Sequence, residues 1–110
     1  MKKEYLGELE ELVLLMILIL KEDAYGLAIR KTLKEKAERS ITIGAVHGTV
    51  NRLENKGFIK SELGGATEIR GGRRKRIFSI TAYGMKVLHR SQEVKVNIWN
   101  QIPGLSLNQI

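Results

Sequence analysis

The chain has 110 residues, no cysteine and a formal net charge of +7 at pH 7. This length favours a single domain with a small core, and the lack of thiols excludes disulfides and thiolate chemistry. The two histidines, His47 and His89, are far apart and have no cysteine partner, so we expect no zinc site and no cofactor.

The positive charge is concentrated in the second part of the chain. Residues 1–40 hold eight Lys/Arg and eight Asp/Glu, whereas residues 41–110 hold eleven Lys/Arg and four Asp/Glu. Five basic residues fall between Arg70 and Arg76, in a glycine-rich stretch. This clustering indicates a polyanionic partner, with nucleic acid ahead of an anionic membrane surface. The alternative is a basic face that is merely solvated.

The longest apolar run, Leu12 to Leu20, is shorter than the roughly 20 residues that span a bilayer. Glutamates precede this run, where a secretory signal would be basic. We therefore expect a cytoplasmic protein that has no membrane partner.

The first 40 residues predict two helices. Apolar side chains almost encircle the first, residues 6–21, so it should be buried on most sides. A monomer this small has little interior, and part of that surface is expected to meet a second subunit. The second helix, residues 24–38, is amphipathic, with Asp23 as its predicted N-cap.

A third helix is predicted from Ile43 to Lys56, with Thr42 as its N-cap and Gly57 at its C-terminal end. Its apolar positions follow the helical period. Gly44 and Gly48 interrupt the opposite face, although each costs about 1 kcal/mol of helix stability. We interpret them as allowing close approach to DNA; the alternative is close packing against a neighbouring helix.

Two antiparallel strands, residues 58–63 and 73–80, should form a hairpin with a glycine-rich tip. Phe78 and Ile80 share the face that packs on the helices. Thr81 then caps a final helix, predicted to run to Ile102.

The predicted fold is mainly α with a small β-hairpin: a winged helix-turn-helix plus a C-terminal dimerisation helix. Residues 1–80 would form the DNA-binding domain, and residues 81–110 the dimerisation helix and tail. Double-stranded DNA is the expected partner. The candidate DNA contacts are Thr42, Gly44, His47, Gly48, Thr49, Asn51 and Arg52 on the third helix, and Arg70, Arg73, Arg74 and Lys75 on the hairpin.

We expect part of the apolar surface of the first helix to meet a second subunit, because it exceeds what a small core can cover. The candidate interface residues are Leu12, Leu15, Ile19, Leu88, Val94, Ile98 and Ile102. Enzyme signatures are missing from the sequence. The glycine-rich hairpin does not match a phosphate loop, and G-x-S-x-G does not occur, so we expect no catalysis.

Four segments resemble the PadR family of bacterial transcriptional regulators, in its short-tailed branch. They are GELEELVLLMIL (residues 7–18), YGLAIRKTL (25–33), ITIGAVHGTVNRLENKGFI (41–59) and GGRRKRIFSITAYG (71–84). The resemblance implies a homodimer that represses by binding inverted repeats, with the last helix packed against the first helix and the partner's equivalent. Family members often have Tyr-Pro where this chain has His47 and Gly48, so the operator cannot be borrowed from relatives.

Some relatives bind flat aromatic compounds at the dimer interface through tryptophan. The resemblance thus makes Trp99 a candidate effector-pocket residue together with Ile102; the alternative is that it packs at the subunit interface. A small-molecule sensor with only incidental DNA affinity is the second functional hypothesis. An RNA-binding module is the third, and the aromatic content of 5% counts against it, since single-stranded RNA needs stacking platforms.

Overall fold

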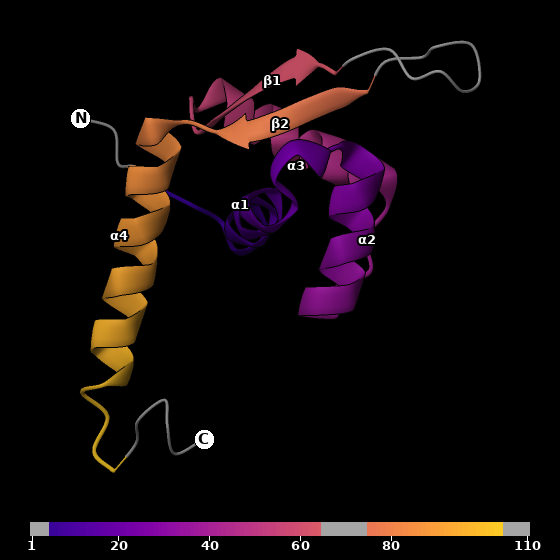
Figure 1. The fold of residues 1–110 in the computed structure, drawn as a ribbon. Helices are drawn as coiled ribbons and strands as arrows, with labels where there is room; N and C mark the ends of the chain where they lie inside the picture. The colour runs from indigo at the N-terminus through magenta and orange to yellow at the C-terminus, as the bar shows by residue number, and fades with distance from the viewer. Residues whose placement is uncertain (1–4, 65–74, 105–110) are drawn as a thin grey trace.

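The computed structural model describes residues 5–64 and 75–104, and it confirms a mainly helical fold with a two-stranded antiparallel hairpin (Figure 1). The elements follow the predicted order. They are α1 (Glu8–Leu20), the short 3₁₀ helix η1 (Lys21–Asp23), α2 (Gly26–Ala37), α3 (Ile43–Asn55), β1 (Ile59–Leu63), β2 (Arg76–Ile80) and α4 (Ala82–Trp99).

Helix α1 lies in the middle of the molecule and contacts α2, α3 and β2. In Figure 1 it is seen almost end-on, with the hairpin above it, α2 on one side and α4 on the other. Its consecutive apolar residues explain this position, because a helix that is apolar nearly all round must be covered on several sides. Four of them are buried: Val13, Leu14, Met16 and Ile17.

Local capping sets the helix ends largely as predicted. The Thr42 hydroxyl accepts a hydrogen bond from the Ala45 N–H at 3.0 Å, and Gly57 follows α3 with a φ of +82°. The prediction that Asp23 caps α2 is wrong. Tyr25 is the N-cap residue, without a side-chain cap, and Asp23 belongs to η1, where its carbonyl accepts the Tyr25 N–H at 2.9 Å.

The hairpin lies over the helices through its buried face. Strands β1 and β2 pair from Ile59 with Ile80 to Leu63 with Arg76. Phe78 is buried and Ile80 packs partly buried against the core, as their shared face predicts. The Phe78 N–H also donates to the Ala24 carbonyl at 2.9 Å, which ties the segment before α2 to the second strand.

The first half of helix α4 packs closely on the body. Its N-cap Thr81 accepts the Gly84 N–H at 2.9 Å, and Gly84 packs directly on the backbone of Phe58. One turn later, Leu88 is only 3% exposed. The prediction that Leu88 belongs to a dimer interface is therefore wrong, because its side chain is used in the core of its own subunit.

Glu11 of α1 makes the polar contact between α1 and α4. Glu11 is only 5% exposed, and its carboxylate accepts hydrogen bonds from Ser91 Oγ at 2.8 Å and Gln92 Nε2 at 2.6 Å. Lys95 forms an ion pair with the same carboxylate. These three partners lie on one side of α4, and they fix the rotation of the helix about its own axis.

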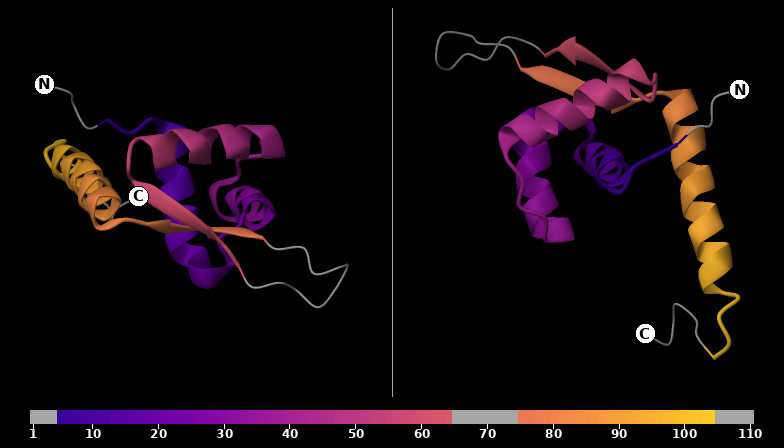
Figure 2. Two further views of the ribbon diagram at one scale, coloured as in Figure 1. Left: turned by 90° about the horizontal axis from the view of Figure 1, so that it is seen from above. Right: turned by 180° about the vertical axis from the view of Figure 1, so that it is seen from behind.

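Beyond Lys95, α4 extends past the body (Figures 1 and 2). It ends at Trp99 rather than at the predicted Ile102, and a turn containing Gly104 at a φ of +77° follows. The molecule is consequently elongated, with extents of 58 × 36 × 21 Å.

Gly84→Ala should strongly destabilise the fold. A Cβ at this position would lie 2.1 Å from the Phe58 carbonyl oxygen, and neither backbone can retreat without moving α4 or β1. We expect the free energy of unfolding to fall by about 3 kcal/mol, measured by urea unfolding. The control is Met85→Ala, since Met85 is 45% exposed and should tolerate truncation. Equal effects of the two changes would contradict the close packing at Gly84.

Candidate nucleic-acid interface

The outer face of α3 is small and uncovered at its N-terminal half. A Cβ on Gly44 would meet only Thr42 Oγ1 at 3.8 Å, and one on Gly48 only Arg52 Nη1 at 3.7 Å, among described atoms outside the helix backbone. Both neighbours belong to α3 or its cap. Within the described residues of one subunit no neighbouring helix packs closely on these glycines, and they leave a shallow open surface.

Polar side chains surround this surface. Thr42, His47, Asn51 and Arg52 are exposed, and Figure 2 (right) shows α3 running across the front of the body beneath the hairpin. The His47 ring lies beside the start of α2, where Cε1 is 3.3 Å from the position of a Cβ on Gly26. The predicted contact residues of α3 thus occupy one accessible side, with one exception.

The exception is Thr49, which is 0% exposed. The prediction that it touches DNA is wrong, because its side chain has no surface to offer. Its Oγ1 donates to the Ala45 carbonyl at 2.8 Å and accepts from Arg52 Nη2 at 3.1 Å. Thr49 therefore contacts a residue of the outer face instead of forming part of it.

Glu10 of α1 links the start of that helix to α3. Its side chain is only 7% exposed. It accepts the Gly7 N–H at 2.8 Å and binds Lys56 Nζ at 2.9 Å through each oxygen, and Arg52 Nε lies 3.5 Å from one oxygen. The carboxylate thus joins the helix start to two cations of α3.

The electrostatic surroundings of Glu10 favour its charged form. Burial alone would raise the pKa of the Glu10 carboxyl. The hydrogen bond from the Gly7 N–H and the cations of α3 outweigh burial, and together they hold this pKa below its ordinary value of 4.5.

The loop end of β2 is joined to the end of α3 through Arg76. Its guanidinium donates to Glu54 Oε1 at 2.7 Å and to Ser61 Oγ at 2.9 Å, and the Ser61 hydroxyl donates to Glu54 Oε2 at 2.8 Å. Next to it, Lys75 Nζ lies 4.0 Å from the centre of the Tyr25 ring. Arg76 therefore has a structural role, whereas Lys75 remains at the surface. Arg70, Arg73 and Arg74 lie outside the described residues.

Sequence analysis missed the residues that support this face. Lys56 was predicted only as the last residue of a helix, and Glu10 and Ser61 were given no role. The signal that was available for Glu10 was its position: a glutamate three residues after a helix N-cap commonly accepts the N-cap N–H. Its contact with α3 had no sequence signal, because 46 positions separate Glu10 from Lys56.

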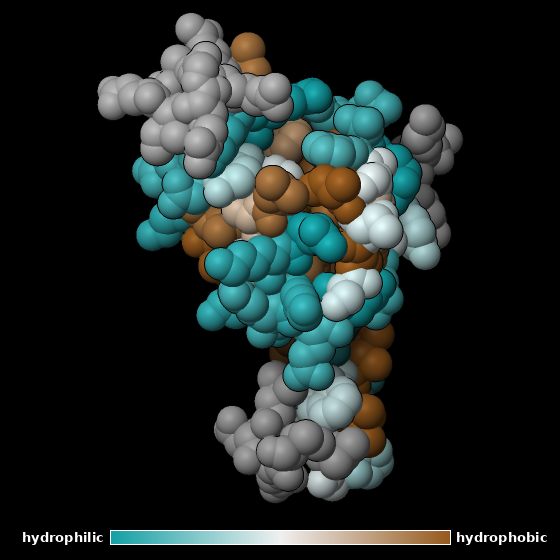
Figure 3. Space-filling view, turned by 90° about the vertical axis from the view of Figure 1, so that its right-hand side faces the viewer, coloured by the Kyte–Doolittle hydropathy of each residue, from teal (hydrophilic) through white to brown (hydrophobic). Residues whose placement is uncertain are grey.

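Apart from Leu88, the predicted dimer residues divide between two apolar surfaces. Leu12, Leu15 and Ile19 line a cavity of about 770 Å³ between α1 and the end of α2. In the second half of α4 and the turn after it, Val94 is 40%, Ile98 59% and Ile102 39% exposed. Hydrophobic atoms continue down this part of α4 below the body in Figure 3.

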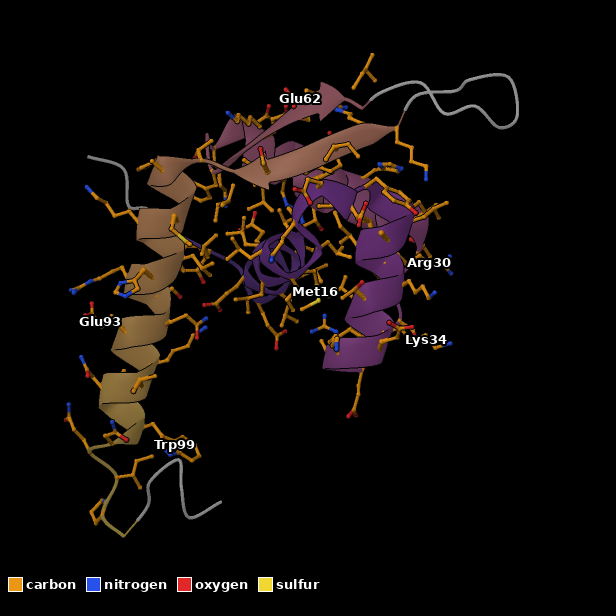
Figure 4. All side chains as sticks on the ribbon, in the orientation of Figure 1. Met16, Arg30, Lys34, Glu62, Glu93 and Trp99 are labelled. Atoms are coloured by element: carbon orange, nitrogen blue, oxygen red, sulfur yellow. The ribbon has the colours of Figure 1, made fainter. Side chains whose placement is uncertain are left out.

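Trp99 ends α4 on the same extended part. Its ring is half-buried, and Nε1 is buried without a hydrogen-bond partner in the described part of the chain. Figure 4 shows the ring on the side of α4 that faces the space below α1 and α2.

In residues 5–64 and 75–104, no three His, Cys, Asp or Glu side chains gather in a way that could hold a metal ion. None of the helices in these ranges has the length and apolar character needed to span a bilayer.

The model of the family described as "Transcriptional regulator PadR-like family" matches residues 14–90. Among solved structures, a PadR-like transcription factor from Bacteroides fragilis is 26% identical, with a TM-score of 0.68 and 84% of each chain covered. A PadR family transcription regulator from Clostridium difficile R20291 is 27% identical, with a TM-score of 0.64, over 86% of this chain and 97% of that one. A PadR family transcriptional regulator from Eggerthella lenta is 29% identical, with a TM-score of 0.61, over 83% and 78%. No protein of curated function matches the sequence.

Glu10→Gln should destabilise the protein in a pH-dependent way. Since the pKa of Glu10 is lowered in the folded state, its charge stabilises the fold above the ordinary value of 4.5, and this contribution is lost as the pH falls through the lowered pKa. We expect a loss of about 2 kcal/mol in the free energy of unfolding at pH 7. The difference from the unchanged protein should shrink in urea unfolding below pH 4.5.

The control for this experiment is Glu8→Gln. The Glu8 side chain is 81% exposed and pairs only with Arg39 among the described residues, so its removal should have little effect at any pH. A Glu10→Gln effect that stayed constant across the acid range would show that the charge of Glu10 is not what stabilises the fold.

Proposed function

Because the chain belongs to the PadR-like family of transcriptional regulators, we propose that it is a homodimeric repressor that binds a palindromic operator through α3. The observation that carries the proposal is the uncovered face of α3, where two glycines lie among exposed polar side chains. A helix with such a face can approach the floor of the major groove and offer hydrogen bonds to base edges.

The contacts proposed for this face differ in kind. Asn51 and Arg52 carry the donors suited to purine edges in the major groove, and Thr42 and His47 lie nearer the N-terminal end of α3, as exposed polar groups. Gly44 and Gly48 would let the backbone of α3 approach the DNA closely, without making hydrogen bonds through a side chain.

The hairpin is proposed to grip the adjacent phosphates. Lys75 is exposed beside Tyr25, and Arg70, Arg73 and Arg74 precede it in the sequence. Phosphate contacts of this type give affinity without sequence information. Arg76 supports the proposal indirectly, because its contact with Glu54 fixes the loop end of β2 to the same helix that would enter the groove.

The dimer is proposed from surface that one subunit leaves uncovered. The radius of gyration is 16.1 Å, whereas a compact domain of 100 residues has about 13 Å. The second half of α4 contributes to this elongation, and its exposed apolar side chains include Val94 and Ile98. The apolar cavity along α1 offers a complementary surface on a second copy.

Release from DNA by a small aromatic effector completes the proposal. Its support is Trp99, whose indole N–H is buried but unpaired within the described residues, since a buried polar group normally has a partner. A ligand acceptor would satisfy it, and so would a carbonyl of the partner subunit. A sensor with only incidental DNA affinity is the alternative function, and it would use the same surface.

The function is tested by selecting DNA from a random pool with the purified protein. We expect an inverted repeat whose half-sites are about one helical turn apart, or a multiple of it. A promoter reporter that carries this site should then show lower expression when the protein is present. Recovery of DNA without any common sequence would refute the proposed function.

Gly48→Ala tests the groove contact on the selected DNA. The added methyl group meets no closer neighbour than 3.7 Å in the free protein, so the helix should gain about 1 kcal/mol of stability. DNA affinity should nevertheless fall, because the methyl group occupies the space in which the groove floor approaches. Thermal unfolding and fluorescence anisotropy measure the two effects. A gain in both stability and affinity would mean that the chain has glycine at position 48 for a reason other than close approach to the groove.

Ile98→Glu tests the dimer. The charge would be placed in an apolar interface without a partner, and dimerisation should weaken roughly 100-fold or more, as measured by sedimentation. His89→Glu is the control, since His89 is an exposed residue on the attached half of α4. A dimer of unchanged stability in the Ile98 variant would contradict the interface proposed here.

A further inference from the structure

We propose that Thr49 and Glu10 are positioning residues that hold the Arg52 guanidinium in the orientation needed to read a guanine in the major groove. The inference rests on the proposed function, and it assigns a specificity role to two residues that cannot themselves reach DNA. It follows from the direction in which each nitrogen of Arg52 points.

One edge of the guanidinium faces the protein. Nη2 donates to Thr49 Oγ1 at 3.1 Å, and Nε lies 3.5 Å from Glu10 Oε2. These two nitrogens form the lateral edge of the planar group, so the hydrogen bond at Nη2 and the ion pair at Nε together turn that edge toward the protein.

Thr49 is suited to accept rather than donate. Its hydroxyl hydrogen is used in the bond to the Ala45 carbonyl at 2.8 Å, so the free lone pair of Oγ1 is what Arg52 meets. The residue is 0% exposed, and neither water nor DNA can compete for that lone pair. The acceptor therefore has a fixed place on α3.

Glu10 is fixed independently of Arg52. The Gly7 N–H and the Lys56 ammonium already hold its carboxylate at 2.8 and 2.9 Å. Arg52 thus pairs with a carboxylate whose position is set by other contacts. A flexible arginine loses rotamer entropy when it is ordered, and restricting it before DNA binds lowers the entropy lost on binding.

The end of the guanidinium, which Nη1 and Nη2 form, is left for a ligand. Nη1 has no hydrogen-bond partner among the described residues, and it lies 3.7 Å from the position of a Cβ on Gly48, over the uncovered face. The remaining hydrogens of Nη1 and Nη2 form an end-on fork. Such a fork matches the O6 and N7 acceptors of guanine, a pair that the major groove presents side by side.

A phosphate is the competing target of the same fork, and the two targets predict different measurements. A guanine contact changes affinity at one base position, whereas a phosphate contact changes affinity for all sequences and the salt dependence. The test therefore compares base preferences, and overall affinity serves as the second readout.

The experiment uses the full-length protein and the DNA duplex selected in the random-pool experiment. Affinities are measured by fluorescence anisotropy for that duplex and for its single-base-pair variants, at two or more salt concentrations. The proteins are the unchanged chain, Arg52→Ala, Thr49→Val, Thr49→Ser and Glu10→Gln. Thr32→Val is the matched control, because Thr32 is a buried threonine of α2, 7% exposed. Thermal unfolding establishes that each variant is folded.

We expect Arg52→Ala to reduce the preference for guanine at one position of each half-site by roughly 5- to 150-fold. Thr49→Val keeps the shape of the side chain but removes the acceptor, and it should reduce the preference at that same position, with the salt slope unchanged. Thr49→Ser should restore the preference. Glu10→Gln should weaken the guanine preference at the same base-pair position. This second variant keeps the test decisive if the valine variant does not fold. Thr32→Val should alter no base preference.

Three results would overturn the inference and leave the proposed function intact. Arg52→Ala could lower affinity equally for every duplex and reduce the salt slope, which would make Arg52 a phosphate contact. Thr49→Val could leave the guanine preference unchanged, or it could lose preference at a position that Arg52 does not control. Failure to select any common sequence would instead refute the proposed function itself.

Discussion

Two adjacent buried carboxylates on α1 hold the two helices on which the proposed function depends. Glu10 contacts Lys56 and Arg52 of α3, and Glu11 contacts Ser91, Gln92 and Lys95 of α4. Because neighbouring residues on a helix point about 100° apart, the two side chains reach in different directions from one place. The orientation of α3 relative to α4 is therefore set at a single point of the most buried helix.

Contacts of this kind contribute more to geometry than to net stability. Moving a carboxylate out of water is costly, and ion pairs only partly offset the cost. The apolar core around Val13 and Leu14 is what stabilises the fold. The stabilisation from apolar burial depends on the area removed from water and not on direction. Hydrogen bonds to Glu10 and Glu11 fix the orientation of α3 and α4 relative to α1, and α3 needs a defined orientation if it is to fit a groove.

Local signals in the sequence were sufficient for most of the fold. The caps at Thr42 and Thr81, the end of α3 at Gly57 and the face shared by Phe78 and Ile80 all follow from short-range chemistry. The prediction that Asp23 caps α2 was wrong because the chain forms η1 there and α2 begins at Gly26. The predictions that Thr49 contacts DNA and that Leu88 lies in the dimer interface failed for a different reason. The helical period does not show how deeply each side chain of α3 and α4 is buried, since burial depends on elements distant in sequence. The same limit hid the roles of Glu10 and Ser61.

Helix α4 acts as a lever about its start, and its contacts with Glu11 oppose that motion. A helix of 18 residues is about 27 Å long, so a tilt of about 10° about Ala82 would move its far end by about 5 Å. That displacement exceeds the 3.4 Å rise of one base pair. If the far ends of two such helices are joined, a tilt that the Glu11 contacts at Ser91, Gln92 and Lys95 do not resist changes the distance between the two α3 helices by about one base pair. The stiffness of this attachment would then decide how strictly the dimer measures the spacing of its operator.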